Sequence, residues 1–542
     1  MSLLRKLHLV KSLLAVLLAV PLLVSCYNHD HEELEMADAS EKFINLKIAV
    51  SADSQSKTRA PLGGENGDGR EAGFQRENMV SGITLILYED ATGINTTANP
   101  ALTFVKYYPT TLESRDVAGS PQTGTTHISG DDKSDLDEAI YTTGDQLVPK
   151  GALAFGKSYH AIVVANRDLT SDLSTSSHLN DVKALVYGAN DLYDGDYGKS
   201  AYACGYFMMS SEYDFEFDLT TPTEIEPNKF YYRPTDTNPI RIERLAARID
   251  FWAAGATYTE KVDKGGTPTD IYGNRYGYVY DVTGTSDKFV VVSITPFNLY
   301  SKGTTYGGEK LLKQLNTGYL LDETDETISS YVLDPSTASK TTANVSAFGT
   351  DGTYLNPLSQ IYTDLNASSP KAMSAAGSPA YYQTIKAMHD KIGSQGGFGA
   401  TFDDNAGGKT GENVIVAYPM ENTLPEEATP STPLYTYATG VAIEGDYYVG
   451  GDLTAAPTAT RVYFGYLMHH QSGSATYAPF KSDDTNVQTA VPTTAMNYGV
   501  VRNNIYRISI EKVSKRTPDQ PKLTIRIEEE KWRHVDNPTI YI

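Results

Sequence analysis

Cysteine and tryptophan are scarce in this chain of 542 residues, which contains two of each. The cysteines are Cys26 and Cys204, and a pattern described below predicts that Cys26 carries a lipid, which leaves Cys204 no disulfide partner within the chain. Cys204 lies in the apolar run 203–207, so we expect a buried side chain rather than a reactive thiol. Because tryptophan is rare and the tyrosines are spread along the chain, little favours a clustered aromatic platform for sugars.

Positive charge is also in short supply. Lysine and arginine number 45 against 67 aspartate and glutamate residues, which gives a formal net charge of −22 at pH 7. Proteins that bind nucleic acids need a basic surface, since the phosphates repel an acidic one. The charge balance argues against nucleic acid as a partner and suits a soluble, self-repelling extracellular protein.

The sequence contains no Walker loop, no Gly-x-Ser-x-Gly elbow and no His-Glu-x-x-His motif. Residues 29–33 (HDHEE) could bind a divalent metal, but a solvated acidic linker is the better interpretation. Residues 131–138 have the carboxylate density of a calcium site but lack the glycine of an EF-hand loop, which favours an exposed acidic loop. We therefore expect no metal, no cofactor and no enzyme activity.

The first 26 residues predict export as a lipoprotein. Arg5, Lys6 and Lys11 precede an uncharged apolar stretch over residues 12–24, which is typical of a signal peptide and shorter than the roughly 20 residues that span a bilayer. Small residues then lead to Cys26, where lipoprotein processing would cleave and attach the lipid. The alternative is an ordinary secretory signal with a chance cysteine. We predict a signal peptide over residues 1–25 and lipidation at Cys26.

Strand patterns dominate the remaining sequence, which has 38 tyrosines, 44 glycines and 26 prolines. The first pattern covers residues 43–50, where Ile44, Leu46, Ile48 and Val50 alternate with polar neighbours and predict a half-buried strand. Many further strand-like runs follow, whereas helical patterns are limited to residues 179–187 and 380–392. Runs of strands with few helices indicate a mainly β chain built of β-sandwiches.

A change of composition near residues 253–273 suggests a domain boundary. The predicted organisation is a tether and propeptide strand over residues 26–59, an N-terminal sandwich over 60–255, a C-terminal sandwich over 256–520 and a last tract over 521–542. Residues 302–411 have little strand signal and are rich in small and polar residues, which indicates a long insertion in the second domain.

The C-terminal part carries a family resemblance. Residues 500–510 (VVRNNIYRISI), a strand over 522–527 and residues 532–535 (WRHV) resemble the end of the fimbrillins of type V pili, in the branch of minor-fimbrium shaft subunits. The Cys26 region, residues 58–60 (TRA), residues 159–166 and residues 244–249 (RLAARI) are similar to the wider family. The resemblance implies two transthyretin-like β-sandwich domains and polymerisation after proteolysis.

The residues themselves are compatible with that mechanism. The alternating strand is followed by residues 51–75, a stretch rich in glycine and polar residues of the kind that proteases cut. A cut there would release the strand and the lipid, and would leave an apolar groove that a strand from another subunit could fill. Arg59 resembles the family's processing position, and Arg70 and Arg76 are alternatives. All three could instead be ordinary loop charges.

The predicted donor is strand-like and terminal. Two segments qualify, residues 523–527 and residues 532–542, although either could simply be an edge strand of its own domain. The candidate donor residues are Leu523, Ile525, Ile527, Trp532, Val535, Ile540 and Ile542.

These features predict a structural subunit of a cell-surface fimbrium that serves adhesion and biofilm formation. Its expected partners are copies of itself, other fimbrial subunits, a processing protease, outer-membrane lipid before cleavage and a surface receptor. A fimbrial tip adhesin of the same family is the nearest alternative, with residues 302–411 as its candidate ligand-binding module. A glycan-binding surface lipoprotein is the alternative from another class.

Overall fold

The computed structural model describes the strands and much of their surroundings. The described residues are 41–50, 70–71, 75–90, 98–117, 120–121, 136–154, 157–187, 191–193, 205–211, 215–218, 223–233, 235, 239–259, 277–300, 309–311, 354–358, 361, 384–385, 388, 401–403, 410–423, 438–467, 474–477, 499–517 and 520–532. Within them β-strands predominate, and the prediction of a mainly β chain is confirmed.

Two sheets build the first β-unit. A ten-stranded sheet has the order β5-β4-β10-β12-β16-β2-β8-β6-β7, with β13 paired to β10, and a four-stranded sheet has the order β14-β15-β1-β9. Their strands are β1 (Glu41–Ile44), β2 (Lys47–Val50), β4 (Gly82–Tyr88), β5 (Leu102–Pro109), β6 (Thr111–Val117), β7 (Ser120–Pro121), β8 (Leu136–Thr142), β9 (Gln146–Val148), β10 (Ser158–Ala165), β12 (Met209–Ser211), β13 (Phe215–Asp218), β14 (Thr223–Glu226), β15 (Lys229–Tyr232) and β16 (Ile240–Arg244).

A twelve-stranded sheet builds the second β-unit. Its main path is β24-β25-β17-β31-β19-β20-β27-β28, and β18, β29, β3 and β32 attach to it. The strands are β3 (Arg70–Glu71), β17 (Arg248–Trp252), β18 (Thr257–Thr259), β19 (Gly277–Thr283), β20 (Lys288–Phe297), β24 (Thr401–Asp403), β25 (Thr410–Ala417), β27 (Gly440–Tyr448), β28 (Ala459–Tyr466), β29 (Ser474–Tyr477), β31 (Asn504–Thr517) and β32 (Gln520–Trp532).

Smaller elements complete the described structure. Three two-stranded pairs join β11 (Val186–Tyr187) to β22 (Glu309–Lys310), β21 (Leu299–Tyr300) to β23 (Tyr354–Leu355), and β26 (Asn422–Thr423) to β30 (Gly499–Val500). The helical segments include η1 (Gln75–Asn78), α2 (Leu179–Ala184) and η6 (Val449–Gly451), and single described residues at 358, 361, 385 and 388 are helical as well. Helix α2 lies where the helical pattern over residues 179–187 predicted one, but it ends at Ala184, and β11 follows.

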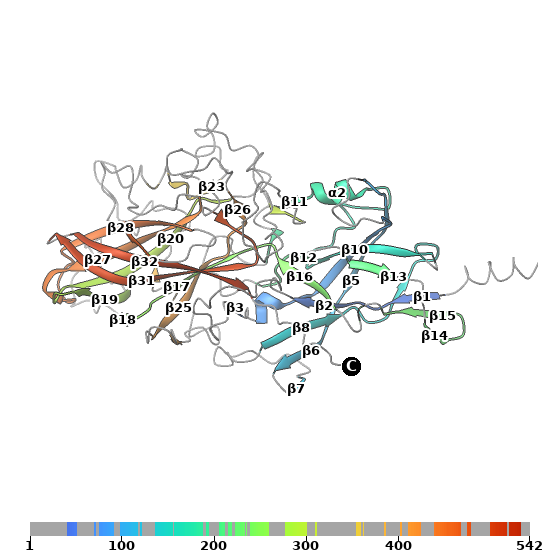
Figure 1. Ribbon diagram of the computed structural model, residues 1–542, viewed down its shortest axis with the longest axis horizontal. Helices are drawn as coiled ribbons and strands as arrows, with labels where there is room; N and C mark the ends of the chain where they lie inside the picture. Colours follow the sequence, from blue (N-terminus) through green and yellow to red (C-terminus); the bar gives the residue numbers. More distant parts are fainter. Residues whose placement is uncertain are drawn as a thin grey trace, which may run out of the picture.

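The two units lie end to end and meet where β16 passes into β17 (Figure 1). The change of sheet occurs at residues 245–247, because β16 pairs within the first unit and β17 pairs with β25 and β31 of the second. The sequence placed this boundary at residue 255, beyond β17. Buried apolar residues form one core in each unit, and the first core continues across the junction to side chains such as Tyr418 and Phe297.

Candidate functional site at the first strand

The first strand of the chain lies in the interior of two sheets. In the four-stranded sheet, β1 is parallel to β15 and antiparallel to β9. In the ten-stranded sheet, β2 is parallel to β16 and antiparallel to β8. We call the space that residues 41–50 occupy between β8–β9 and β15–β16 the first-strand trough. Both edges of this segment are therefore used in pairing, although it is the first described segment of the chain.

The apolar side chains of this segment belong to the core. Ile44, Leu46, Ile48 and Val50 are exposed by 5% or less, as their alternation indicated. Ala49 is buried as well, so the end of β2 is covered on both faces and is not the half-buried strand that the sequence predicted. Its neighbours β16 and β8 cover only its edges, so other parts of the first unit must cover its second face.

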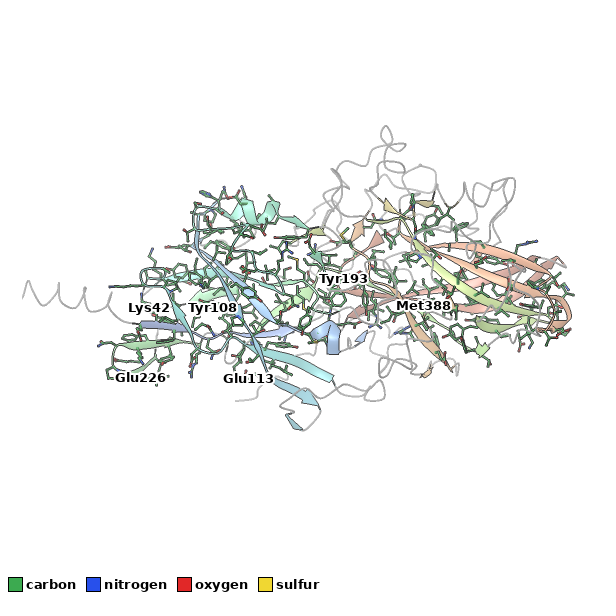
Figure 2. The ribbon with its side chains drawn as sticks, turned by 180° about the vertical axis from the view of Figure 1, so that it is seen from behind. Lys42, Tyr108, Glu113, Tyr193, Glu226 and Met388 are labelled. Atoms are coloured by element: carbon green, nitrogen blue, oxygen red, sulfur yellow. The ribbon has the colours of Figure 1, made fainter. Side chains whose placement is uncertain are left out.

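The polar side chains of the segment lie toward its outer surface. Lys42 donates to the carbonyl of Leu153 at 2.6 Å, and Lys47 forms an ion pair with Glu113 at 3.0 Å. Figure 2 shows Lys42 and Glu226 toward the outer end of the first unit, and Glu113 belongs to β6, which is separated from β2 by β8. Such partly exposed pairs contribute little to stability, about 0–1 kcal/mol each. The burial of the apolar side chains dominates.

The segment changes sheet between β1 and β2, and hydroxyl groups hold it at this crossing. The main-chain N–H of Leu46 donates to Oγ1 of Thr143 at 3.0 Å, and that of Lys47 donates to Oγ1 of Thr235 at 2.6 Å. The carbonyl of Leu46 accepts from the N–H of Thr143 at 3.0 Å. Both threonines are buried. The regular ladders are interrupted at this crossing, and the two threonine hydroxyls accept the main-chain N–H groups that would otherwise lack a partner.

The neighbouring segments change sheet at the same place. β8 passes into β9 through a bend at Gly144, whose φ of 63° lies in the left-handed region that glycine adopts without strain. On the other side β15 leads to β16 through residues that include Thr235. Burial raises the pKa of the hydroxyl of Tyr232, whose partner in the parallel pairing of β15 with β1 is Ile44. Within the described residues, β8 and β9 line one side of the trough, and β15 and β16 line the other.

Departure of residues 41–50 would uncover four strand edges at once. β9 and β15 would lose their partner in the small sheet, and β8 and β16 would lose theirs in the large one. Uncovered N–H and C=O groups and an apolar floor together form a template for another strand. Burying four large apolar side chains is worth roughly 1.5–3 kcal/mol each, or on the order of 6–12 kcal/mol before entropy.

Two of the three candidate processing arginines lie in the described part of the chain. Arg59 lies outside the described residues, in the connection between β2 and β3. Arg70 belongs to β3, where its backbone pairs in parallel with Lys531 of β32, so it is in a sheet rather than in the flexible context that the sequence indicated. Arg76 lies in η1, directly before Glu77, which is fully buried. The structure therefore describes the surroundings of two of the three positions, Arg70 and Arg76.

Glu77 is part of a buried cluster of charges at the junction of the two units. Its carboxylate forms an ion pair with Arg248 at 3.3 Å and accepts from the hydroxyl of Tyr418. Arg248 also pairs with Asp250 at 2.6 Å, and Asp250 accepts from the amide of Asn413 at 2.8 Å. All of these side chains are fully buried. A buried charge without partners is costly, so each member depends on the others.

Hydrogen bonds around residues 77–78 connect the first unit to the second. Arg244 donates to the carbonyl of Glu77 at 3.0 Å, to the side chain of Asn78, and to Asn503 of the second unit at 3.0 Å. The hydroxyl of Tyr141, from β8 in the wall of the trough, donates to the carbonyl of Asn78 at 2.8 Å. Burial lowers the pKa of Arg244 to about 10, and the nearby Glu77 opposes this shift. Residues 77–78 thus connect both units and the trough.

Tyr418 extends the junction on its apolar side. Its ring packs edge-on against Phe207 and Tyr193, and its carbonyl accepts from the hydroxyl of Tyr193 at 2.9 Å. Figure 2 shows Tyr193 between the two units, whereas Met388 lies within the second. The junction therefore combines buried charges with packed aromatic rings.

The predicted donor residues fall into two groups. Leu523 and Ile525 are buried in the core of the second unit, and β32, which contains them, pairs along most of its length with β31. Ile527 and Trp532 are also in β32, whereas Val535, Ile540 and Ile542 lie outside the described residues. The structure thus favours the alternative considered above for residues 523–527, a strand of their own domain. Cys26 and Cys204 are outside the described residues as well.

No protein-family model matches the chain, and no curated protein does either. Among solved structures, a chain described as a cell adhesion protein from Parabacteroides distasonis is similar over 91% of this chain and 99% of that chain, with 12% identity and a TM-score of 0.37. The tip fimbrial protein Mfa3 from Porphyromonas gingivalis is similar over 91% and 100%, with 8% identity and a TM-score of 0.34. A fimbrilin from Porphyromonas gingivalis is similar over 92% and 99%, with 12% identity and a TM-score of 0.30.

The structural neighbours are thus fimbrial and cell adhesion proteins, the kind of protein that the sequence resemblance predicted. With TM-scores below 0.5 and such low identities, these likenesses do not establish what this chain does. The proposals below rest on its own residues.

Within the described residues, no group of three or more His, Cys, Asp or Glu side chains could hold a metal ion. The acidic segments considered as metal sites lie almost entirely outside that part of the chain: residues 29–33 do so completely, and only the backbone of residues 136–138 is described. In the same described part, no helix is long and apolar enough to cross a membrane.

Sequence reasoning missed both polar features of the site, which are the buried charges around Glu77 and the two threonines at the crossing between β1 and β2. One signal was present for the junction cluster, because Arg244 and Arg248 lie in the strand-like run over residues 240–252 and buried arginines require partners. Glu77 gave no such signal, and neither did Thr143 and Thr235, since threonine is ordinary in strands and loops. Their partners lie far away in the sequence, so only the fold reveals them.

Proposed function

We propose that the chain is a structural subunit of a cell-surface pilus, or fimbrium, that polymerises by donor-strand exchange. The precursor is exported as a lipoprotein and held at the outer membrane by a lipid on Cys26. A protease cuts at an arginine after the first strand, the strand leaves with the lipid, and a strand of another subunit takes its place. The resulting filament serves adhesion and biofilm formation.

The position of the first strand carries this proposal. Residues 41–50 pair on both edges and bury four large apolar side chains, yet only the connection over residues 51–69 joins them to the described strands that follow. A central strand is normally fixed by chain on both sides. Here a single cut in that connection separates the strand from the rest of both units, and binding by strand addition becomes possible.

The surroundings of Arg70 and Arg76 make these two positions less suitable for a cut, which supports a cut at Arg59. A protease binds its substrate as an extended segment, and Arg70 is already paired with β32. A cut after Arg76 would place the new N-terminal ammonium group on Glu77. The buried carboxylate of this residue pairs with Arg248 and accepts from the hydroxyl of Tyr418. A cut at Arg59 leaves the junction cluster in the mature chain, with Arg70 as the second choice.

The donor is the tract that follows β32. Because Leu523 and Ile525 belong to the core of their own unit, withdrawing them would unfold it, and residues 533–542 are the remaining candidates. Val535, Ile540 and Ile542 supply the apolar side chains of that tract. The partners of the subunit are therefore copies of itself and other subunits of the filament, and the receptor contacted by the filament is a separate question.

Replacement of the arginines tests the mechanism. The Arg59→Ala variant should greatly reduce the SDS-resistant ladders of sheared surface material, and Arg59→Ala, Arg70→Ala and Arg76→Ala together should abolish them while the precursor stays folded. Arg167→Ala is the matched control, since Arg167 pairs with Asp191 at the surface away from the trough. N-terminal sequencing of the mature protein should give Ala60.

Other outcomes would reassign the protein. Ladders that persist in the triple variant would rule out cleavage-driven exchange. A mature chain that starts at a lipidated Cys26 and stays monomeric at high concentration would indicate a permanently anchored binding protein. Filaments that carry the chain only at one end would indicate a tip adhesin.

A further inference from the structure

We propose that two side-chain bridges hold the walls of the first-strand trough one strand apart while the trough is empty. This inference rests on the proposed function, because it concerns the interval between the departure of one strand and the entry of the next. The inner bridge runs from Tyr141 through Asn78 to Arg244, and the outer bridge joins Asp145 to Arg233. These are positioning residues, since they shape the trough and belong to neither strand that occupies it.

The order of the strands shows why the walls need such support. β2 lies between β16 and β8 in the ten-stranded sheet, and β1 lies between β15 and β9 in the four-stranded sheet. Among the described ladders, no other joins β6, β7, β8 or β9 to the rest of the first unit. When β1 and β2 leave, these four strands become a separate part of the unit, which we call the β6–β9 flap. Without a further connection the flap is free to close the trough or to move away from it.

The inner bridge joins the flap to the opposite wall beside the junction of the two units. Tyr141 stands in β8, and its hydroxyl donates to the carbonyl of Asn78 at 2.8 Å. From the other wall, Arg244 at the end of β16 donates to the carbonyl of Glu77 at 3.0 Å and to the side chain of Asn78. None of these bonds involves residues 41–50, so they can persist after the strand has left.

The middle of the inner bridge is fixed independently of the first strand. Glu77 pairs with Arg248 of the second unit at 3.3 Å, and the carbonyl of Met79 accepts from the amide of Asn166 at 2.8 Å. Residues 77–79 also follow all three candidate cleavage positions in the sequence. The inner bridge therefore stays in the mature chain whichever arginine is cut.

The outer bridge crosses the trough at its exposed face. Arg233 follows β15 and Asp145 lies in the bend between β8 and β9, so the two side chains come from opposite walls and meet at 2.9 Å. Arg233 also lies over the ring of Tyr231 in its own wall, 5.6 Å from the centroid. Asn45 of the first strand donates to the same carboxylate at 3.1 Å. Release of the strand removes Asn45 and leaves the ion pair in place.

A trough that keeps this width can accept a strand without first being rebuilt. Preorganisation of this kind lowers the entropy that binding must offset, while the uncovered strand edges and the apolar floor remain ready to associate. A bound strand links the two walls by its own ladders, so the bridges matter most when it is absent. We therefore expect them to speed the uptake of a strand and to have little effect on how firmly a bound strand is held.

Exchange of the first strand in the purified chain tests the bridges directly. A precursor whose residues 60–66 are replaced by the site of a sequence-specific protease can be cut in solution while its own first strand remains bound. An excess of a fluorescent peptide with the sequence of residues 41–50 should then replace that strand. Fluorescence anisotropy measures the rate of uptake, at a protein concentration too low for ladders to form.

Tyr141→Phe removes the hydroxyl of the inner bridge and keeps the ring, which packs in the core of the first unit. It should slow the uptake about fivefold, the effect of losing one buried hydrogen bond in the empty state. Tyr278→Phe is the matched control, since its hydroxyl donates to Glu412 within the second unit, and it should leave the rate unchanged. Circular dichroism of the uncut variants shows whether they have folded.

Asp145→Asn breaks the outer bridge at a partly exposed position, where folding is not at risk. At low salt it should slow the uptake about twofold. Its difference from the parent should vanish at about 1 M salt, where the Debye length falls to about 3 Å and the pair is screened. Glu89→Gln is the control, because it removes an exposed pair with Lys157 that joins the neighbours β4 and β10 rather than the two walls.

The direction of the change decides between two roles of the bridges. If they served to lock the strand in, both variants would release it sooner and take up the peptide faster, which would overturn the inference. Unchanged rates in both variants would overturn it as well, and in either case the exchange seen in the parent would leave the proposed function standing. A parent chain that takes up no peptide after the cut and forms no ladders at high concentration would contradict the proposed function itself.

Discussion

The first and the last described strands of the chain look alike and are held differently. The β1–β2 segment and β32 each lie beside other strands on both edges, and each buries alternating apolar side chains. However, β32 follows β31 through a short hairpin, with Thr517 paired to Gln520, whereas residues 51–69 separate β2 from the next strand. If the proposed strand exchange occurs, this difference predicts that the ability of a strand to leave depends on how it is connected to the chain and not on how deeply it is buried.

Deletion of each strand in turn should give the largest contrast. A precursor without residues 41–50 should have no stable monomer, because four strand edges and the core beneath them are uncovered. A synthetic peptide with the sequence of residues 41–50 should restore a monomer with its thermal transition, measured by size-exclusion chromatography and circular dichroism. A scrambled peptide is the control.

Deletion of residues 520–532 should not be rescued in this way. The matching peptide would have to re-form a hairpin partner for β31 and refill the core at Leu523 and Ile525. The proposed difference between the two strands would be contradicted if both deletions were rescued equally. It would also be contradicted if the chain without residues 41–50 melted at the same temperature as the parent.

The junction cluster should stay with the mature chain, and Glu77→Gln tests how much it contributes to the free energy of unfolding. Removing one partner of a buried ion pair typically costs about 3–5 kcal/mol, and Arg248 would lose one of its two carboxylates. Denaturant unfolding of both the precursor and the mature subunit should show the loss.

Glu113→Gln is the control for this effect. It removes a partly exposed pair with Lys47, and it should change the free energy of unfolding by about 1 kcal/mol or less. An equal effect of the two variants would show that the junction cluster contributes no more than a surface pair.

Alanine substitutions in the two strands should separate precursor from filament. Ile48→Ala should lower the unfolding free energy of the precursor by about 2–5 kcal/mol and leave filament stability unchanged, since Ile48 departs with the released strand. Leu523→Ala should destabilise precursor and filament subunits by a similar amount. Denaturation of precursor and sheared filaments in parallel measures both. A filament weakened by Ile48→Ala would show that residue 48 stays in the mature protein.

The smallest expected effect is an acid sensitivity of the second unit. A hydrogen bond from Tyr447, followed by one from the backbone of Gly450 and by Lys515, lowers the pKa of Asp287 below its usual value. An unfolded chain takes up this proton at a higher pH than the folded one, so the stabilisation is present above about pH 4 and is lost as the pH falls through the folded pKa. Asp287→Asn should flatten the decline of the denaturation midpoint between pH 5 and pH 2.5.

Local patterns in the sequence were enough to predict the mainly β fold and the burial of the four alternating side chains of the first strand. Alternation over Ile44–Val50 could be recognised because side chains on a strand repeat every two residues. The same signal at residues 523–527 could not show that Leu523 fills the core of its own unit, since alternation does not identify the neighbouring strands. Position in the sheet, not periodicity, distinguishes the two segments.

The polar parts of the site depend on contacts that no local pattern encodes. Thr143 and Thr235 bond to residues 97 and 188 positions away, and Glu77 meets Arg248 at a separation of 171. A single sequence therefore predicts that Arg244 and Arg248 need partners without showing which residues provide them.

The direction of the first strand has a mechanical consequence. β1 and β2 run along the long axis of the molecule (Figure 1), and any occupant of the same trough would run that way too. Tension along the axis would pull such a strand lengthwise, so the bonds to both neighbours would share the load and break together instead of opening one by one. A joint of this kind resists stretching far better than a peeling force applied across it.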